Sequence, residues 1–273
     1  MAMLALGGLF GPRRVLAMHF HHTGVKPVWQ WRLIYRVALR RFRAITFPSD
    51  FVRREAERMY PPVAKLARTI RNPLPLPDLA TSSDRRAARL AIGLPAGAPV
   101  IGNAGWLIQR KRFDVFLHVA ALVHAAMPEA EFLIAGNGPQ RTELVALADR
   151  LGVGSKVHWL GWQEDLTHFY RSLDVLVFNS DWDAFPTTPL EAMAHGLPVV
   201  ASLVNGGLEE VMGRNGDVGF LLPTHDVDRL ARMVMDLLCK PATRRMTADR
   251  ARERVSKMCS VDTCVTAVER LLL

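Results

Sequence analysis

The chain has 273 residues, of which 49% are hydrophobic and 22% charged. This composition is that of a globular protein with a sizeable core, and it excludes an intrinsically disordered chain. No apolar run reaches the roughly 18 to 20 residues of a membrane helix. Residues 1–10 are apolar, but Arg13 and Arg14 follow them, which is the wrong order for a signal peptide. We expect residues 1–10 to be the remnant of a buried element.

The net charge of +9 is unevenly distributed along the chain. Residues 1–77 contain 14 Lys and Arg against 3 Asp and Glu, so this segment carries +11 and the remainder −2. A basic segment of this kind fits an anionic or lipid-linked acceptor, peripheral contact with a membrane, or simply a solvated face. Nucleic acid is disfavoured as a partner, because the sequence lacks helix-turn-helix, zinc-finger and RNA-recognition patterns.

The three cysteines bear on the cellular compartment. Cys239, Cys259 and Cys264 all lie near the C-terminus and lack metal-ligand spacing. This pattern indicates reduced thiols in a cytoplasmic protein. Peripheral contact at the inner membrane face is compatible with that location.

The first part of the chain alternates strands with helices up to a proline-rich segment. Residues 72–77 contain three prolines, which fix the backbone and remove hydrogen-bond donors, so a domain boundary is expected there. Ser49 is a candidate N-cap. The expected elements are a strand at 13–19, a helix at 27–42, a strand at 44–47, a helix from Ser49 to about residue 60 and a strand at 67–70.

After the prolines, strands and helices alternate regularly, which is typical of a parallel, doubly wound sheet. We expect residues 78–242 to form one complete Rossmann-like domain, residues 1–77 a partial Rossmann-like domain, and residues 243–273 helices that pack back toward the N-terminal part. The expected strands of the complete domain are 99–104, 131–135, 157–160, 175–178, 199–201 and 218–222. Its expected helices are 84–92, 113–126, 140–151, 166–172, a short one from residue 206, and 227–238.

Residues 180–201 predict a strand end, a loop, a helix and a further strand. The loop then lies at the carboxyl end of a parallel strand, where open α/β sheets bind ligands. Thr187, Thr188 and Leu190 belong to the first helical turn, whose free backbone N–H groups and positive dipole end suit an anion.

Two carboxylates, Asp183 and Glu191, bracket this turn. A phosphate bound between two carboxylates that contact hydroxyl groups would suit a sugar nucleotide. The alternative is structural, because Thr188-x-x-Glu191 is also a capping box in which Glu191 satisfies a backbone donor.

A longer pattern favours the first of these alternatives. Residues 183–202, Asp-Ala-Phe-Pro-Thr-Thr-Pro-Leu-Glu-Ala-Met-Ala-His-Gly-Leu-Pro-Val-Val-Ala-Ser, resemble the Glu-x7-Glu region of the family 4 retaining glycosyltransferases of GT-B fold. The resemblance implies a nucleoside-diphosphate-sugar donor and no required cofactor or metal. It implies that Glu191 binds the ribose hydroxyls, that Asp183 lies by the donor sugar, and that the helix start takes the diphosphate. Asp183 is one methylene shorter than the family's first Glu.

The loop at residues 105–111 is similar to the family's Gly-Arg-Leu-x-x-x-Lys, whose two cations hold the donor diphosphate. Lys111 matches the Lys, whereas Trp106 replaces the Arg. Arg110 and Arg112 are candidate substitutes. The alternative for Lys111 is a solvated surface lysine.

Two further turns resemble loops around the family's nucleotide site. Gly136 and Gly138 belong to a Gly-x-Gly-Pro sequence, and Gly161 and Trp162 match the turn that faces the base. Taken alone, such glycines indicate tight turns. For Trp162 the alternative is core packing.

His19, His21 and His22 lie close together in the first domain. Their spacing alone permits a metal site, but no carboxylate or cysteine is near, which favours unligated histidines. The resemblance places one histidine of this cleft near the reacting sugar, and both His21 and His22 remain candidates. His195 is interpreted as structural.

The resemblance is strong over residues 99–240 and weak over 13–77. It implies a first domain that is several strands short of that of a complete GT-B enzyme. On the strength of the resemblance over residues 99–240, the first hypothesis is a retaining glycosyltransferase. The second is a nucleotide-sugar-binding or partner-dependent subunit without activity of its own, and the third is a nucleotide-sugar epimerase.

Overall fold

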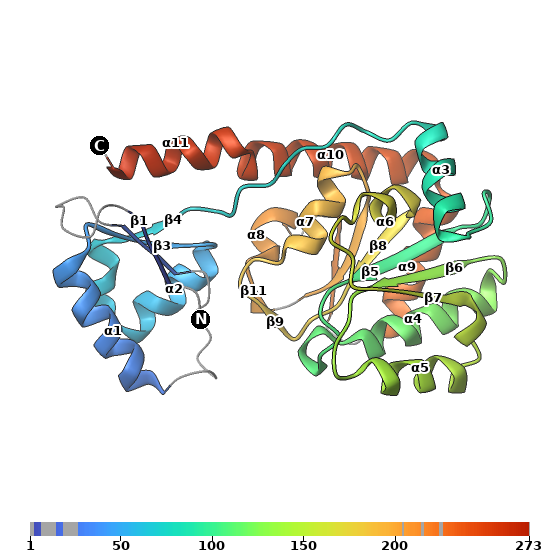
Figure 1. Ribbon diagram of the computed structural model, residues 1–273, viewed down its shortest axis with the longest axis horizontal. Helices are drawn as coiled ribbons and strands as arrows, with labels where there is room; N and C mark the ends of the chain where they lie inside the picture. The colour runs from blue at the N-terminus through green and yellow to red at the C-terminus, as the bar shows by residue number, and fades with distance from the viewer. Residues whose placement is uncertain are drawn as a thin grey trace.

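The computed structural model describes residues 3–6, 15–18, 27–203, 205–213, 216–223 and 226–272. They form two α/β units joined by an extended segment, with a long C-terminal helical pair running along both (Figure 1). Among these residues, none of the helices combines the length and apolar character needed to cross a bilayer.

The first unit contains a sheet of order β1-β2-β3-β4, in which β1 is antiparallel to β2 and the other pairs are parallel. Trp31 and Tyr35 of the first helix pack with Phe47 beneath the sheet. The expected strand at 13–19 is described over 15–18. The elements are β1 (Met3–Leu6), β2 (Val15–Met18), α1 (Val28–Arg41), β3 (Ala44–Phe47), α2 (Asp50–Met59), η1 (Pro61–Lys65) and β4 (Ala67–Thr69).

Ser49 caps α2 as expected, because its hydroxyl oxygen accepts the N–H of Val52. Residues 70–81 then form neither helix nor strand. The next helix, α3 (Ser82–Ile92), begins two residues before the expected start because Thr81 and Asp84 form a capping box there.

The second unit contains a six-stranded, fully parallel sheet of order β12-β10-β8-β5-β6-β7, which confirms the predicted doubly wound architecture. An apolar cluster covers each face of the sheet. The strands are β5 (Val100–Ala104), β6 (Glu131–Ala135), β7 (Val157–Gly161), β8 (Val175–Phe178), β10 (Val199–Ser202) and β12 (Phe220–Leu222). The remaining elements up to residue 239 are η2 (Gln109–Lys111), α4 (Phe113–Ala126), α5 (Arg141–Arg150), η3 (Gly154–Lys156), α6 (Thr167–Ser172), α7 (Thr187–Ala194), α8 (Leu208–Met212) and α9 (Val227–Cys239).

Two of the strands were not predicted from the sequence because each has only two residues. They are β9 (Trp182–Asp183) and β11 (Asn205–Gly206), which pair in parallel and hold the loop after β8 against the start of α8.

The chain ends in α10 (Pro241–Cys259) and α11 (Val261–Leu272). The first of these packs on α7, and its last carbonyl oxygen, that of Cys259, accepts the N–H of Leu74 in the extended segment at 2.7 Å. Figure 1 shows α11 extending over the first unit. The C-terminal helices therefore contact the segment that joins the two units.

Candidate active site

Two loops at the carboxyl ends of β5 and β8 form one wall of the candidate site. The carbonyl oxygen of Arg110 accepts both the N–H of Asp181, at 2.8 Å, and the hydroxyl of Ser180, at 3.1 Å. In return, the Arg110 guanidinium donates to the carbonyl oxygen of Trp182 at 2.9 Å and lies over the Trp182 ring. These bonds fix the loop that carries Lys111 against the loop that carries Asp183.

Lys111 and Asp183 form an ion pair in the cleft between the two units. The Nζ of Lys111 lies 2.6 Å from Oδ2 of Asp183, and the two side chains are only 17% and 15% exposed. The Phe178 ring lies beneath the ammonium group. Because Lys111 is mostly buried and paired, the solvated-lysine interpretation is wrong. The cleft has a volume of about 330 Å³ and is lined by Pro48, Asn72, Arg110, Lys111 and residues 182–188.

The two candidate substitutes for the missing arginine lie differently. Arg110 lines the cleft beside Lys111. Arg112 instead forms ion pairs with Asp114 and Asp181 outside it. Trp106, which occupies the arginine position, is 64% exposed. Of the two, Arg110 is therefore the one placed to add positive charge to the cleft.

The start of α7 lies against the same cleft. The helix begins at Thr187, which is exposed, and its N-cap position is Pro186, without a side-chain capping bond. The Thr188 hydroxyl donates to the carbonyl oxygen of Ala104 at 3.1 Å, which ties α7 to β5. The side chain of Leu190 is buried in the core, so this residue can face a ligand only with its backbone. The N-cap residue of α7 is Pro186, and the side chains of Thr188 and Glu191 bond to Ala104 and Tyr170. The capping-box alternative for Thr188 and Glu191 is therefore wrong.

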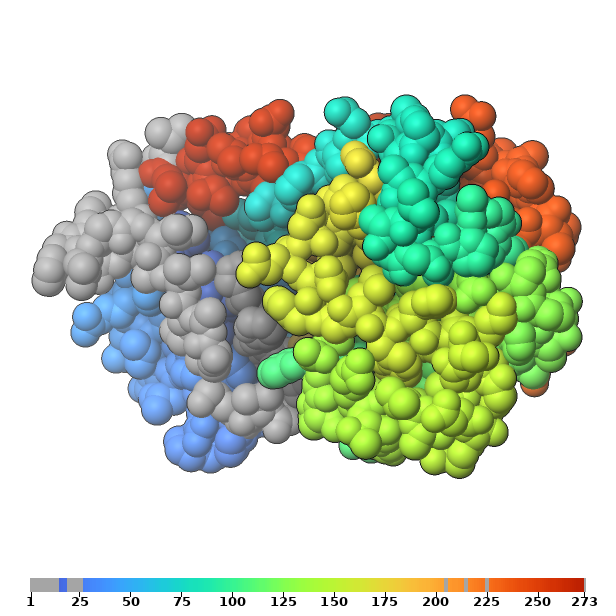
Figure 2. All heavy atoms as spheres, turned by 45° about the vertical axis from the view of Figure 1, so that its right-hand side comes forward, coloured from blue at the N-terminus to red at the C-terminus, as the bar shows by residue number. Residues whose placement is uncertain are grey.

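Glu191 lines a second cavity, of about 430 Å³, one turn further along α7. Its Oε2 accepts the hydroxyl of Tyr170 at 2.6 Å. The extended segment and α6 close this cavity, and Figure 2 shows the teal segment beside the yellow residues of α6. The lining residues are Leu74, Pro75, Pro77, residues 164–167, Tyr170, Glu191, Ala194 and His195. Asp183 and Glu191 thus border two neighbouring cavities, and α7 contributes to both.

The protonation states around Glu191 follow from burial. Burial, the charge of Glu191 and the hydrogen bond to it raise the pKa of Tyr170, so the phenol stays protonated and donates. The His195 ring stacks on Tyr170 with 4.8 Å between centroids. Burial and the charges of Arg171 and Arg252 lower the pKa of His195 to about 4, so the ring is neutral at pH 7.

The predicted glycines bring three loops together. The Gly136 N–H donates to the carbonyl oxygen of Gly161 at 2.7 Å. A Cβ on Gly136 would lie 1.9 Å from the carbonyl oxygen of Gly105, and one on Gly138 would lie 2.4 Å from that of Leu107. Trp162, after Gly161, is 70% exposed, so the core-packing interpretation is wrong. Close backbone approach requires Gly136 and Gly138 here.

Two predicted histidines and two residues without a predicted role remain to be placed. His21 and His22 lie outside the described residues. Tyr170 and Arg110 were not assigned firm roles from the sequence. A tyrosine next to Phe169 on a short helix has the pattern of a core aromatic, and only the bond to Glu191 distinguishes it.

Comparison with known proteins places these features in a family. Residues 84–254 match the model of the family described as glycosyl transferases group 1. The chain is 39% identical over 180 residues to a D-inositol 3-phosphate glycosyltransferase of a Mycobacterium species, covering 63% of this chain and 39% of that protein. It is 29% identical over 184 residues to the lipopolysaccharide core biosynthesis glycosyltransferase LpsE of Rhizobium meliloti, covering 67% of this chain and 52% of that protein. The chain thus spans about half or less of the length of these relatives.

Solved structures extend the likeness to the first unit. Anabaena HepE in complex with UDP superposes with a TM-score of 0.86 at 21% identity, covering 94% of this chain and 71% of that one. The glycosyltransferase WaaG superposes with a TM-score of 0.76 at 19% identity, covering 94% and 74%. These neighbours confirm the expected GT-B fold. With the family match over residues 84–254, they show that the chain belongs to the glycosyl transferases group 1 family.

Proposed function

We propose that this chain binds a nucleoside-diphosphate sugar and transfers the sugar to an acceptor with retention of configuration, without a required metal. The observation that carries the proposal is the cleft in which Lys111, Asp183 and the first turn of α7 meet. A buried cation beside a helix N-terminus suits a diphosphate, and a carboxylate in the same cleft suits sugar hydroxyls.

The proposed roles follow the charge changes of the reaction. Negative charge builds on the leaving diphosphate as the glycosidic bond breaks, so Lys111 and the N–H groups of Thr187 and Thr188 stabilise the transition state more than the ground state. Glu191 holds the ribose and Asp183 orients the sugar. The family resemblance assigns a role beside the reacting sugar to one of His21 and His22. Gly136, Gly138, Gly161 and Trp162 border the base.

The nature of the donor is a further part of the proposal. HepE was crystallised with UDP, with UDP-glucose, and with UDP and glucose. This favours UDP as the first nucleotide to test, with GDP and ADP as comparisons.

The decisive experiment is calorimetric titration of the purified chain with UDP, GDP and ADP, followed by turnover of the matching sugar nucleotide. We expect one diphosphate to bind. In Glu191→Ala that binding should be lost while the melting temperature stays close to that of the wild type. Tyr170→Phe is the matched control, because it removes the partner of Glu191 but keeps the carboxylate. Unchanged affinity in Glu191→Ala would contradict the assignment of the ribose to Glu191.

A second candidate function is a nucleotide-sugar-binding subunit that needs a partner for turnover. The observation that favours it is Trp106, which leaves the cleft one cation short of the family pattern. Diphosphate binding without turnover, with turnover restored by an added partner, would support this function over the first. Isomerisation of the donor sugar without any acceptor would instead indicate an epimerase.

For the acceptor we propose an anionic or lipid-linked molecule, reached by peripheral contact of the first unit with the inner face of a membrane. Trp29, Leu33 and Val37 recur every four residues on α1 and are 63%, 54% and 51% exposed. Arginines flank this apolar stripe at positions 32, 36, 40 and 41, and α1 carries no acidic residue. An apolar stripe between arginines suits the surface of an anionic bilayer.

Co-sedimentation with vesicles tests this contact. We expect binding to mixed phosphatidylglycerol and phosphatidylcholine vesicles but not to phosphatidylcholine alone, and loss of binding in the Trp29→Ser, Leu33→Ser double variant. Val265→Ser is the control, because Val265 is an exposed apolar residue of α11, on a different helix. Equal sedimentation of the double variant and the wild type would reject the α1 face as the contact.

A further inference from the structure

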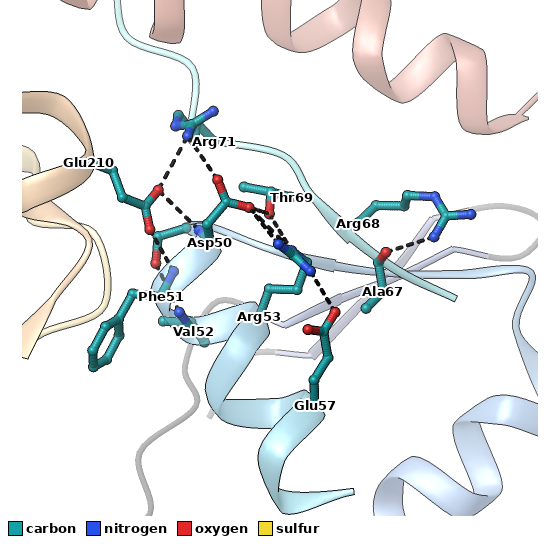
Figure 3. A network of polar contacts seen from close by, with 11 residues as sticks. Asp50, Phe51, Val52, Arg53, Glu57, Ala67, Arg68, Thr69, Arg71 and Glu210 are labelled. Atoms are coloured by element: carbon teal, nitrogen blue, oxygen red, sulfur yellow. Dashed lines mark hydrogen bonds and ion pairs between the residues drawn. The ribbon is translucent and has the colours of Figure 1, made fainter. Parts of the chain in front are cut away.

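Glu210 of the second unit binds the N-terminus of a helix in the first unit. Its Oε2 accepts the N–H of Asp50 at 3.0 Å, and its Oε1 accepts the N–H of Phe51 at 2.5 Å. Asp50 and Phe51 are the first two residues of α2, whereas Glu210 lies on α8. Figure 3 shows the carboxylate directed at the start of the helix. One side chain thus joins two units whose residues are far apart in the sequence.

This contact complements the local cap of α2. The first N–H groups of a helix lack partners within the helix, and its N-terminus carries a positive partial charge. Ser49 accepts one of these donors, that of Val52. Glu210 accepts the N–H groups of the two preceding residues, Asp50 and Phe51, and brings a negative charge to the positive end of the helix. The start of α2 is therefore fully paired only while the second unit is docked on it.

Arg71 joins the same cluster from the segment that connects the two units. Its Nη2 lies 3.2 Å from Oε2 of Glu210 and 3.4 Å from Oδ2 of Asp50. The three side chains are 19 to 31% exposed, so water screens them only partly. Asp50, Arg71 and Glu210 therefore tie α2, the connecting segment and α8 together at one place, where the chain leaves the first unit (Figure 3).

The docked helix also contacts the donor-site loop. The Ser49 hydroxyl, which is fully buried, donates to the carbonyl oxygen of Ala184 at 2.7 Å. From the other side, the N–H of Gly207 donates to the carbonyl oxygens of Asp183 and Ala184. A Cβ on Gly207 would lie 2.6 Å from both Ser49 Cβ and the Ala184 carbonyl oxygen. The backbone next to the Asp183 side chain is thus held between α2 and the residue before α8.

We propose that Glu210 is a positioning residue that docks the first unit on the loop of Asp183 and so fixes the donor-site carboxylate between the two units. The inference rests on the proposed transferase function for its kinetic consequence. Its structural consequence, the coupling of α2 to the loop at 180–186, is independent of that function.

The test compares Glu210→Gln with Glu55→Gln. Glu210 accepts one N–H group with each of its two oxygens, whereas an amide places an NH2 donor where one of these oxygens stood, so the first variant loses the two-oxygen contact. Glu55 also lies on α2, where it forms an ion pair with Arg58 of the same helix. Both variants remove one negative charge.

We expect Glu210→Gln to speed amide hydrogen exchange at residues 50–53 and also at 180–186. We expect it to lower kcat about tenfold or more, as for loss of hydrogen bonds to a charged group, with the dissociation constant for UDP unchanged. The control should change none of these. Faster exchange confined to residues 50–53, with kcat unchanged, would overturn the proposal and leave a local helix cap. A wild type without turnover would defeat the proposed function, while the exchange pattern would still decide the role of Glu210.

Discussion

Lys111 Nζ lies 2.6 Å from Asp183 Oδ2, so the cation proposed to bind the diphosphate and the carboxylate proposed to orient the sugar are partners in the structure. Both belong to loops held together by the backbone of Arg110. A bound diphosphate would compete with Asp183 for the ammonium group. The pair therefore links donor binding to the freeing of the carboxylate.

This competition predicts opposite effects of two substitutions on nucleotide affinity. Lys111→Ala should weaken UDP binding about tenfold to a hundredfold, the range expected when a hydrogen bond to a charged group is lost. Asp183→Asn should tighten UDP binding about threefold to tenfold, because a negative charge near the phosphates is removed, and yet it should abolish transfer. Calorimetric titration and donor turnover on the same samples check both. Weaker UDP binding in Asp183→Asn would contradict the proposed competition.

Trp106→Arg tests whether the missing cation limits the site. Trp106 is largely exposed on the loop that leads to Lys111, so the substitution should leave the fold intact. An added guanidinium should tighten UDP binding about tenfold, in line with a charge-assisted hydrogen bond, and should raise kcat as well if the reaction is transfer. Trp106→Lys is the matched control, because it adds a cation that lacks the planar guanidinium group and its paired N–H donors. No gain from either variant would mean that Arg110 already supplies the charge.

The glycine loops predict a specific loss of stability. Gly136 has a φ of +136° and no room for a Cβ beside Gly105, so Gly136→Ala should destabilise the chain by about 2 to 6 kcal/mol, the sum of backbone strain and overpacking. Gly152→Ala is the control, because Gly152 also has a positive φ but open space around its Cα, and its cost should be about 1 to 2 kcal/mol. Urea unfolding of the three proteins measures the difference. Equal losses would show that the close approach to Gly105 contributes nothing.

Part of this site could be predicted because the alternation of apolar runs marks the strand ends and turns around Asp183, Glu191 and Lys111. The roles expected for these residues came from the resemblance of residues 105–111 and 183–202 to the family. The same periodicity predicts the parallel sheet. The short strands β9 and β11 carry no such signal, since two residues have no period.

The contacts between the units could not be predicted in this way. Glu210 is an ordinary acidic residue of a short helix, and its partner Phe51 lies 159 positions earlier in the chain. Its role depends on how the two units dock, which no hydrophobic periodicity encodes. Thr188 illustrates the opposite error, because its local capping-box pattern is real but the side chain bonds to Ala104 of a neighbouring strand instead.

The interface between the units should also depend on pH through Asp50. Burial tends to raise the pKa of this carboxyl, but hydrogen bonds from Thr69 and Arg53 and the charges of Arg53 and Arg71 lower it overall below its ordinary value of 3.8. A carboxyl whose pKa is lowered on folding stabilises the folded state at pH values above its unfolded pKa. That contribution is lost as the pH falls through 3.8 and then through the lower folded value.

Asp50→Asn isolates this contribution. The free energy of unfolding of the wild type should exceed that of Asp50→Asn at pH 7, and the difference should shrink as the pH falls below about 4. Thr69→Val is the matched variant, because it removes the 2.5 Å hydrogen bond to Asp50 but keeps the charge of the carboxylate. The difference in unfolding free energy between the wild type and Thr69→Val should therefore shrink over the same pH range by a smaller amount. Urea unfolding at a series of pH values measures both. A difference that stays constant down to pH 3 would mean that the carboxylate of Asp50 contributes through its shape and hydrogen bonds rather than its charge.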